Sequence, residues 1–325
     1  MYTASKIYKD VTRAEAEAII AHSIPGASVT GYTPVSGGLF NTTYKVVTEN
    51  PCRELVLRVG PINRELLLPY ERHLMDAEAY VNKLLTAHGV PTPELVACDT
   101  SKTVIDRDYM ITAYMDSVAL SDSSVPEERR DALYEETGRL MRAVHAVKGE
   151  KYGRIADFFA GIQYDTWADF MMAHIAEVGA LCMQFGVFDA VFINRVTAMY
   201  HNCRPLFETV TEPFLIHADI WAGNILVKET GGAYNVTAII DADRAVFGDI
   251  DFELGSPWIM GEPFFRGYGP VPDSPDRRKR MKLYCLMYNL IDTYVWKVEY
   301  VNDHEYEVNR DRALGTMKWL EDHIN

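Results

Sequence analysis

Four polar residues in the second half of the chain have types and spacing that suit phosphoryl transfer. His217 and Asp219 follow the apolar run 214–216, Asn224 comes five positions after Asp219, and Asp241 follows a second apolar run. An aspartate beside a hydroxyl group can orient it and accept its proton. Mg²⁺ prefers hard oxygen ligands, so an asparagine and a second aspartate can supply the protein's share of a magnesium site.

Two other interpretations of these residues stay open. The carboxylates can lie in a solvated polar loop between two strands, because a motif match is only a hypothesis. They can also belong to a metal-dependent hydrolase that uses Asp219, Asp241 and Asp243. That hydrolase would leave Arg58 and a glycine pair near the N-terminus without a role. Asp243 itself can assist the metal or pair with the neighbouring Arg244, and we expect the ion pair.

The sequence predicts a β-hairpin that positions the polar residues. Residues 225–227 and 236–240 are rich in Ile and Val, and the Gly231-Gly232 pair between them is typical of a hairpin turn. Such a hairpin would bring the segment 219–224 and Asp241 to the same end of the structure.

The first third of the chain predicts a β-rich unit. A capping box at residues 12–15 opens a short helix. Three strands follow it, at residues 28–35, 42–48 and 54–59. Between the first two strands, a turn runs from Ser36 through Gly37 and Gly38 to Asn41. Its glycines would let backbone N–H groups approach a phosphate, although a plain hairpin turn is the alternative. It is not a Walker loop, because no G-K-[ST] follows.

A strand cation and a helix carboxylate form a predicted pair. Arg58 lies on the third strand, and Glu78 lies within the apolar stripe of a helix predicted over 66–88. A carboxylate that faces a core needs a partner, because an unpaired buried charge costs several kcal/mol. We expect Arg58 to be that partner. The alternatives are an exposed arginine and a glutamate that extends to water at the edge of the stripe.

The rest of the chain predicts two more strands and then a helical region. The strands are expected at 95–98 and 109–115, and the polar connector 116–124 marks a boundary between two units. Helices are predicted from a second capping box at Ser124–Glu127 to about 147, from Thr166, and over 188–200, 277–300 and 310–323. We therefore expect an α+β protein, with a β-rich N-terminal unit over 1–115 and a mainly helical unit over 116–325.

Charge and cysteine content restrict the partners and the compartment. The net charge of −14 disfavours binding to nucleic acid or to an anionic membrane, and it is compatible with a cationic substrate. The five cysteines are scattered and form no C-x-x-C, which favours a reducing compartment, so we expect a cytoplasmic protein. No signal peptide or membrane-spanning run of about 18 apolar residues is evident.

With these pieces placed, the chain resembles the aminoglycoside phosphotransferase family of small-molecule kinases. The resemblance rests on LIHADIWAGNIL with IIDADRAVFGD, and on the glycine turn, the VLRV strand and the YMITAYM segment in the expected order. It covers about residues 35–268. Within the family, YDTWADF, HADIWAGN and FGDIDFE look most like the hygromycin B phosphotransferase branch. The resemblance implies a bilobal protein-kinase-like fold, with one long helix beside the small antiparallel sheet.

The resemblance also implies roles for individual residues. Asp219 would be the catalytic aspartate and His217 the structural histidine of its loop, with Asn224 and Asp241 as metal ligands. The nucleotide would be bound by the glycine turn, by the Arg58–Glu78 pair and by a hinge, which assigns Ser36, Gly37, Gly38, Asn41, Arg58, Glu78, Thr112, Ala113 and Tyr114. Glu253 stands where most members of the family have Asp.

The expected function is ATP-dependent O-phosphotransfer with Mg²⁺, and GTP is an alternative donor. The acceptor would be an aminoglycoside-like or other amine-bearing antibiotic, with antibiotic resistance as the biological role, bound beneath the segment 258–268 and the later helices. Alternatives are a kinase of a small metabolite, such as an amino alcohol, a sugar or a homoserine-like molecule, and a nucleotide-binding pseudokinase. The intact Asp219, Asn224 and Asp241 argue against the pseudokinase. The protein would be a monomer or a homodimer.

Overall fold

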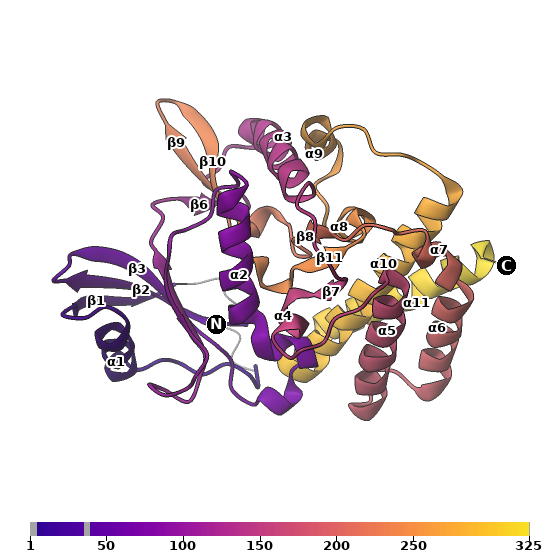
Figure 1. Cartoon of the computed structure of the whole chain (residues 1–325), viewed down its shortest axis with the longest axis horizontal. Coiled ribbons are helices and arrows are strands. Elements are labelled where there is room, and N and C mark those ends of the chain that lie inside the picture. The colour runs from indigo at the N-terminus through magenta and orange to yellow at the C-terminus, as the bar shows by residue number, and fades with distance from the viewer. Residues whose placement is uncertain (1–4, 36–39, 325) are drawn as a thin grey trace.

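The computed structural model describes residues 5–35 and 40–324. Its strands and helices separate into a sheet-containing part and a larger helical part, and one helix, α2, stands between them (Figure 1). The expected α+β architecture is therefore present. Ser36, Gly37 and Gly38 of the predicted phosphate turn lie outside the described residues.

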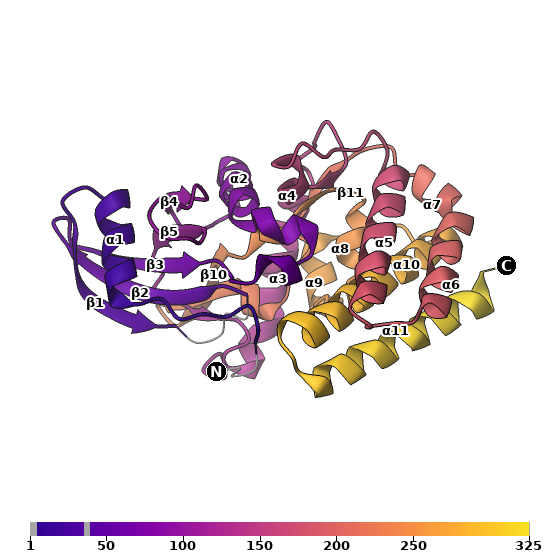
Figure 2. The same ribbon diagram turned by 90° about the horizontal axis from the view of Figure 1, so that it is seen from below.

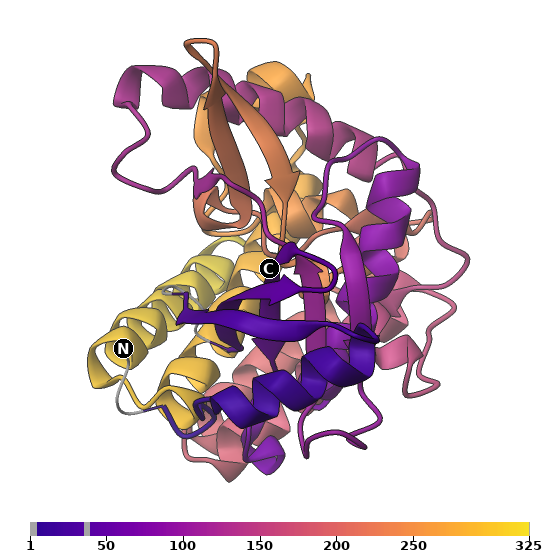
Figure 3. The same ribbon diagram turned by 90° about the vertical axis from the view of Figure 1, so that its left-hand side faces the viewer.

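The N-terminal part is a five-stranded antiparallel sheet with strand order β1-β2-β3-β5-β4. Helix α1 opens with the predicted capping box at Thr12, and its buried isoleucines share an apolar cluster with alternate residues of β2 and β3. Figure 3 shows α1 lying along this sheet. The elements are α1 (Arg13–Ser23), β1 (Ser28–Pro34), β2 (Thr42–Glu49), β3 (Arg53–Val59), β4 (Leu95–Asp99) and β5 (Tyr109–Ala113).

The long helix of this part begins later than predicted. Instead of one helix over 66–88, two 3₁₀ turns at Arg64–Leu66 and Pro69–His73 precede α2 (Leu74–Ala87). The reason is Pro69, because the residue before a proline is disfavoured in helical conformation and Leu68 is extended there. The apolar face of α2 packs into the main hydrophobic cluster of the helical part.

The helical part contains most of the helices and two small three-stranded sheets. In one sheet β11 lies between β7 and β8, and in the other β9 lies between β10 and β6. Figure 2 shows α11 running beneath α10, α5 and α6. The elements are β6 (Val118–Ala119), α3 (Glu127–Val144), β7 (Gly153–Arg154), α4 (Ile155–Phe158), α5 (Trp167–Gln184), α6 (Ala190–Asn202), α7 (Arg204–Glu208), β8 (Phe214–Ile216), β9 (Ile225–Thr230), β10 (Ala233–Ile239), β11 (Val246–Gly248), α8 (Ile250–Leu254), α9 (Gly261–Tyr268), α10 (Pro275–Tyr294) and α11 (Asp303–His323).

The predicted helix starts in this part need two corrections, and one of them is that α11 begins after its N-cap residue Asn302, before the predicted residue 310. Thr166 caps α5 as predicted. The capping box predicted at Ser124 does not form, because α3 starts at Glu127 with Pro126 as its N-cap residue. Ser124 instead donates its backbone N–H to the Asp122 carboxylate at 2.8 Å in the preceding turn. A local side-chain hydrogen bond has therefore replaced the cap.

Two further properties bear on the expectations from composition. Among the described helices, none combines the length and apolarity that crossing a membrane would require. The five cysteines are free thiols, at positions 52, 98, 182, 203 and 285.

Candidate active site

The loop that follows β8 is fixed by hydrogen bonds on both sides of the His217 ring. Its Nε2–H donates to the carbonyl oxygen of Ile240 at 3.0 Å, and its Nδ1 accepts the backbone N–H of Asp219 at 3.3 Å. Burial lowers the pKa of His217, so the ring stays neutral and keeps one donor and one acceptor. His217 therefore shapes this loop and orients the backbone of Asp219.

Asp219 lies in an environment that raises its proton affinity. Burial raises the pKa of its carboxyl group to about 8 against the opposing charge of Arg244, and the charge of Asp241 adds to the rise. The side-chain amide of Asn224 donates to the Asp219 backbone carbonyl at 2.8 Å and to its Oδ2 at 3.1 Å. Such a carboxyl group is suited to exchanging a proton with a hydroxyl near neutral pH.

The predicted hairpin is present and brings Asp241 next to this loop. Strands β9 and β10 pair with Ile225 opposite Ile239, and the N–H of Ile240 donates to the carbonyl oxygen of Asn224 at 3.0 Å. Asp241 then adopts a left-handed backbone conformation with φ +61°. This conformation is uncommon for a residue with a side chain, and it turns the chain out of the strand.

Arg58 joins the sheet to α2 and to Asp241. Its Nη1 contacts both carboxylate oxygens of Glu78, at 2.6 and 2.7 Å, and its Nη2 forms an ion pair with Asp241. Glu78 is only 3% exposed, so the alternative in which it extends to water is wrong. Burial raises the pKa of Glu78, and the Arg58 charge opposes that rise. The predicted Arg58–Glu78 pair is thus confirmed and extended by a third residue.

Asp243 lies in the same cluster, and its expected partner is engaged elsewhere. Carboxylate oxygens of Glu78, Asp241 and Asp243 lie within 4.8 Å of one another. Asp243 is 6% exposed, and its carboxylate has no hydrogen bond or ion pair within the described part of the chain. The predicted Asp243–Arg244 pair is wrong, because Arg244 pairs with Glu71 at 2.8 Å. Burial raises the pKa of Asp243 well above its ordinary value.

The predicted hinge residues close β5. Thr112 is buried in the sheet. The N–H of Ala113 donates to the backbone carbonyl oxygen of Glu94, and the N–H of Tyr114 donates to that of Glu54. These two amides are therefore already committed to the sheet. Asn41, at the end of the predicted phosphate turn, is 6% exposed, and its Oδ1 has no partner within the described ranges.

Glu253 in α8 anchors the Asp219 loop through the backbone. Its two carboxylate oxygens accept the N–H groups of His217 at 2.8 Å and Ala218 at 3.0 Å. Ala218 has φ +63°, a left-handed conformation that costs an L-residue about 1–2 kcal/mol. Glu253 also lies 3.4 Å from Nε2 of His145, whose Nδ1 is 2.7 Å from the hydroxyl of Tyr268.

Residues 31–278 match the model of the phosphotransferase enzyme family. The chain belongs to this family. It is 32% identical to a chloroplastic protein-ribulosamine 3-kinase of rice over 171 residues, 48% of each protein, so it spans about half the length of that relative. It is 25% identical to a probable ketoamine kinase of Lactiplantibacillus plantarum over 82% of this chain and 89% of the relative. It is also 26% identical to a hygromycin-B 4-O-kinase of Escherichia coli over 67% of this chain and 63% of the relative.

Solved structures show that this phosphotransferase-family chain has the expected kinase-like fold. A crystal structure of an aminoglycoside phosphotransferase in ternary complex with AMP-PNP and hygromycin B superposes with a TM-score of 0.66 at 20% identity, over 94% of this chain and 98% of the other. A putative fructosamine-3-kinase from Haemophilus somnus gives 0.64 at 13% identity, over 91% and 96%. The predicted family and the predicted bilobal α+β fold are both confirmed.

Several contacts that support the predicted site residues were not predicted from the sequence. The contact between Glu253 and His145 was not predicted, because the two residues are 108 positions apart in the sequence. The available signal for Glu253 was its place in the acidic run FGDIDFE, which follows Asp241 closely. No local pattern predicts the Arg244–Glu71 ion pair, because it joins two segments far apart in the sequence, the loop after β10 and a 3₁₀ turn before α2.

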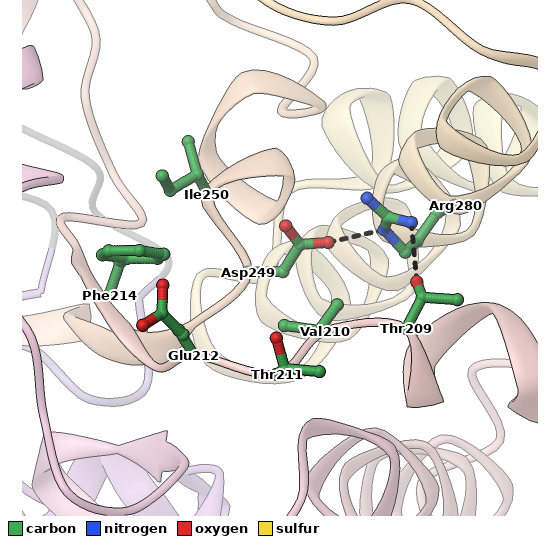
Figure 4. A pocket seen from close by; sticks show the side chains of 8 residues that line it. All are labelled: Thr209, Val210, Thr211, Glu212, Phe214, Asp249, Ile250 and Arg280. Carbon is green, nitrogen blue, oxygen red and sulfur yellow. Dashed lines mark hydrogen bonds and ion pairs between the residues drawn. The ribbon is translucent and has the colours of Figure 1, made fainter.

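A small pocket of about 190 Å³ lies elsewhere in the helical part (Figure 4). It is lined by the segment after α7, the start of α8 and Arg280 of α10, and it contains none of the predicted site residues. Arg280 is engaged there with Asp249 at 2.6 Å and with the Thr209 hydroxyl at 3.3 Å. This pocket is therefore held by structural contacts and is distinct from the Asp219 site.

Proposed function

We propose that the chain transfers the γ-phosphoryl group of a nucleoside triphosphate to a hydroxyl group of a small molecule. One observation carries the proposal: Asp219, Asn224 and Asp241 converge at the end of the β9–β10 hairpin, where Arg58 reaches Asp241 from the sheet. In this reaction type, positioning and electrostatic stabilisation supply most of the catalysis. Asp219 would orient the acceptor hydroxyl and take its proton.

The residues at this site fit a magnesium ion. Asn224 and Asp241 offer the hard oxygen ligands that Mg²⁺ prefers, and the nearby Asp243 is a buried carboxylate without a partner among the described residues. Glu78 and Asp241 both pair with Arg58, and Asp243 lies beside them without a partner among the described residues, so added positive charge would be favourable. When bound, the ion would neutralise charge on the phosphate oxygens. We assign Asn224 and Asp241 as its ligands, with Asp243 as a further candidate.

We propose ATP as the donor, with GTP as the alternative. The relative in ternary complex contains AMP-PNP, whereas another structure of the fold, an aminoglycoside 2'-phosphotransferase at 15% identity, is a GDP complex. The N–H groups of Ala113 and Tyr114 are used within the sheet. Chain alternation would turn the carbonyl of Ala113 and the N–H of Met115 toward a base instead. The hinge contact would thus move one residue beyond the expected Thr112–Tyr114 segment.

We propose an amine-bearing polyol as the acceptor. The relatives are named for ketoamines, ribulosamine and hygromycin B, which combine an amine with neighbouring hydroxyls. The net charge of −14 favours such a cation. Trp221, two positions after Asp219, is 44% exposed, and its ring lies so close to Gly223 that a Cβ there would be 2.2 Å away. An exposed aromatic face suits the C–H face of a sugar.

Two roles follow from the two kinds of relative. Similarity to ketoamine and ribulosamine kinases favours a metabolic role on glycated amines, and similarity to the hygromycin kinase favours antibiotic modification, as first expected. Free thiols at all five cysteines agree with the proposed cytoplasmic location. The same assay can separate the two roles, because it compares acceptors directly.

The proposal is tested by measuring nucleotide consumption and phosphorylated product with Mg·ATP and Mg·GTP. The acceptors are hygromycin B, kanamycin, a fructosyl-lysine and a ribulosyl-lysine. Asp219→Asn should lower kcat by at least about 10²- to 10⁴-fold, the contribution of a general base, while nucleotide affinity is retained. Asp165→Asn, at an exposed aspartate, is the matched control and should keep wild-type turnover. Unchanged turnover in Asp219→Asn would remove the catalytic assignment.

A further inference from the structure

Two buried polar groups near Asp219 lack hydrogen-bond partners among the described residues. They are the indole Nε1–H of Trp258 and the hydroxyl of Tyr288. Their rings contact each other edge to face, with centroids 5.2 Å apart. Nearly all buried polar groups in native proteins are paired, and each unpaired group weakens the folded state. Two such groups in contact therefore indicate a surface that a ligand completes.

Tyr288 lies on α10, within electrostatic reach of the Asp219 loop. Asp292 follows it by four positions, so both side chains lie on the same side of the helix. The charge of Asp219 acts on the Tyr288 hydroxyl, and the charge of Asp292 acts on Asp219. An acceptor held by Tyr288 and Asp292 would thus lie beside the carboxylate that activates its hydroxyl.

Trp258 is carried by a short non-helical connection with a glycine at each end. Residues 255–260 form a non-helical connection between α8 and α9, with Gly255 at one end and Gly261, at φ +69°, at the other. Ser256 in this connection has a buried hydroxyl that also lacks a partner within the described ranges. Three unpaired polar groups therefore lie in or against one short connection, and each would gain a hydrogen bond from a bound ligand.

We propose that Trp258, Tyr288 and Asp292 form an acceptor subsite for an amine-bearing polyol, reached when the connection 255–260 shifts. The inference rests on the proposed phosphotransfer, whose acceptor it places. The ligand's ammonium group would donate to the Asp292 carboxylate. The Tyr288 hydroxyl and the Trp258 indole N–H would donate to hydroxyl or ring oxygens of the ligand.

The electrostatic surroundings of Asp292 leave room for such a cation. Burial raises the pKa of Asp292 to about 7, and Arg244 and Arg312 are the cations that oppose this rise. Arg244 is engaged with Glu71 at 2.8 Å, and Nη1 of Arg312 donates to the Asn309 side-chain oxygen at 3.2 Å. Both guanidinium groups therefore have other partners, and the Asp292 carboxylate has no hydrogen bond or ion pair in the described part of the chain.

The first test is on the free protein and compares two tyrosines of α10. Tyr288→Phe removes an unpaired hydroxyl, so the melting temperature should stay the same or rise. Tyr294→Phe is the matched control, because its hydroxyl donates to the Leu66 carbonyl at 2.7 Å, and its loss should lower the melting temperature. Equal destabilisation by both variants would show that Tyr288 has a partner in the free protein and would overturn the inference.

The second test measures acceptor binding by calorimetry in the presence of Mg·AMP-PNP. The probes are hygromycin B, a fructosyl-lysine and sorbitol as a neutral polyol. Tyr288→Phe and Trp258→Phe should each lower the affinity for the amine-bearing probe by about tenfold. This is the effect expected when one hydrogen bond made in the complex is lost. Asp292→Asn should weaken that probe and leave sorbitol unchanged. Tyr294→Phe should bind as wild type does.

The outcomes separate this inference from the proposed function. Wild-type affinity in Tyr288→Phe, Trp258→Phe and Asp292→Asn would overturn the subsite, even if the enzyme turns over normally. Binding of a probe that depends on these residues, without phosphorylated product, would support the subsite and count against phosphotransfer. Failure of wild type to bind either amine-bearing probe would overturn the ligand class.

Discussion

At the residue scale, what surrounds each buried carboxylate decides its effect on stability. Glu78 has a charged partner in Arg58, whose Nη1 contacts both of its carboxylate oxygens. Asp157, in α4, has a partly buried side chain, and burial raises its pKa to about 6, although the charges of Arg154 and His73 oppose the rise. The folded state thus favours the protonated form of Asp157 far more than the unfolded chain does, and it is destabilised when that proton is lost.

Asp157→Asn should therefore stabilise the protein at neutral pH. Below about pH 4 the carboxyl group is protonated in both states, so it contributes no pH dependence there. Between about pH 4 and 6 the folded state retains a proton that the unfolded state has released, so stability falls as pH rises through this window. The variant should be more stable by about 1–3 kcal/mol at pH 7.5, with the difference shrinking toward pH 4. Denaturant unfolding at both pH values measures this.

The matched control for this prediction is Asp165→Asn, because Asp165 is exposed and pairs with Lys151 at the surface. Surface pairs of this kind contribute about 0–1 kcal/mol, so little change is expected at either pH. A lower free energy of unfolding for Asp157→Asn at pH 7.5 would show that the Arg154 attraction outweighs burial.

At the scale of elements, a short helix holds the loop that carries Asp219. Glu253 of α8 accepts two consecutive backbone N–H groups, and one belongs to Ala218 in its left-handed conformation. His145, the C-cap residue of α3, connects Glu253 of α8 to Tyr268 of α9. Glu253 is fully buried, and its carboxylate holds the backbone of the two residues that precede Asp219.

Glu253→Gln should impair catalysis more than nucleotide binding. A glutamine offers one acceptor oxygen and presents an amide to the second backbone N–H, which loses its partner. We expect a loss of about 1–3 kcal/mol in the free energy of unfolding and about 10²-fold in kcat, because the reacting group is displaced. Nucleotide affinity, measured by calorimetry, should be unchanged. The control is Glu262→Gln, at an exposed position of α9; equal losses in both variants would contradict the assignment.

At the scale of the molecule, Arg58 connects the sheet, α2 and the helical part. It lies on β3, Glu78 on α2, and Asp241 after β10, so one guanidinium joins three segments that are distant in sequence. We propose that residues up to 115 form a nucleotide-binding lobe and that 116–325 form the acceptor lobe. The Arg58 contacts would then be a direct polar link between the lobes.

Removing this link should destabilise the protein in a non-additive way. Arg58→Met leaves the buried Glu78 carboxylate without its partner and should cost about 3–5 kcal/mol. Adding Glu78→Gln removes that unpaired charge, so the double variant should be more stable than Arg58→Met alone. Denaturant unfolding of the two single variants and the double variant measures this double-mutant cycle. Hydrogen exchange in β3 and α2 shows where the structure is destabilised. If the two losses simply add, the pair is not a coupled unit.

Local sequence signals predicted much of this architecture. The 2-residue alternation in β2 and β3, the Thr12 capping box and the Gly231-Gly232 turn are each set by neighbouring residues, and each was confirmed. Two errors in the predicted helix starts were also local, because Pro69 delayed α2 and Asp122 replaced the cap predicted at Ser124. In both places a competing short-range interaction outweighed the periodic pattern.

The sequence by itself determined the family, the kinase-like fold, and the hairpin that brings Asn224 next to Asp241, because these depend on residue order and short-range geometry. The Arg58–Glu78 pair was also predictable, since a carboxylate within an apolar stripe requires a cation. Only the tertiary structure decided that Arg58 also reaches Asp241, that Arg244 pairs with Glu71, and that Glu253 holds the Asp219 loop. Those choices depend on which of several charged groups packing brings within reach, and packing joins segments that sequence distance keeps apart.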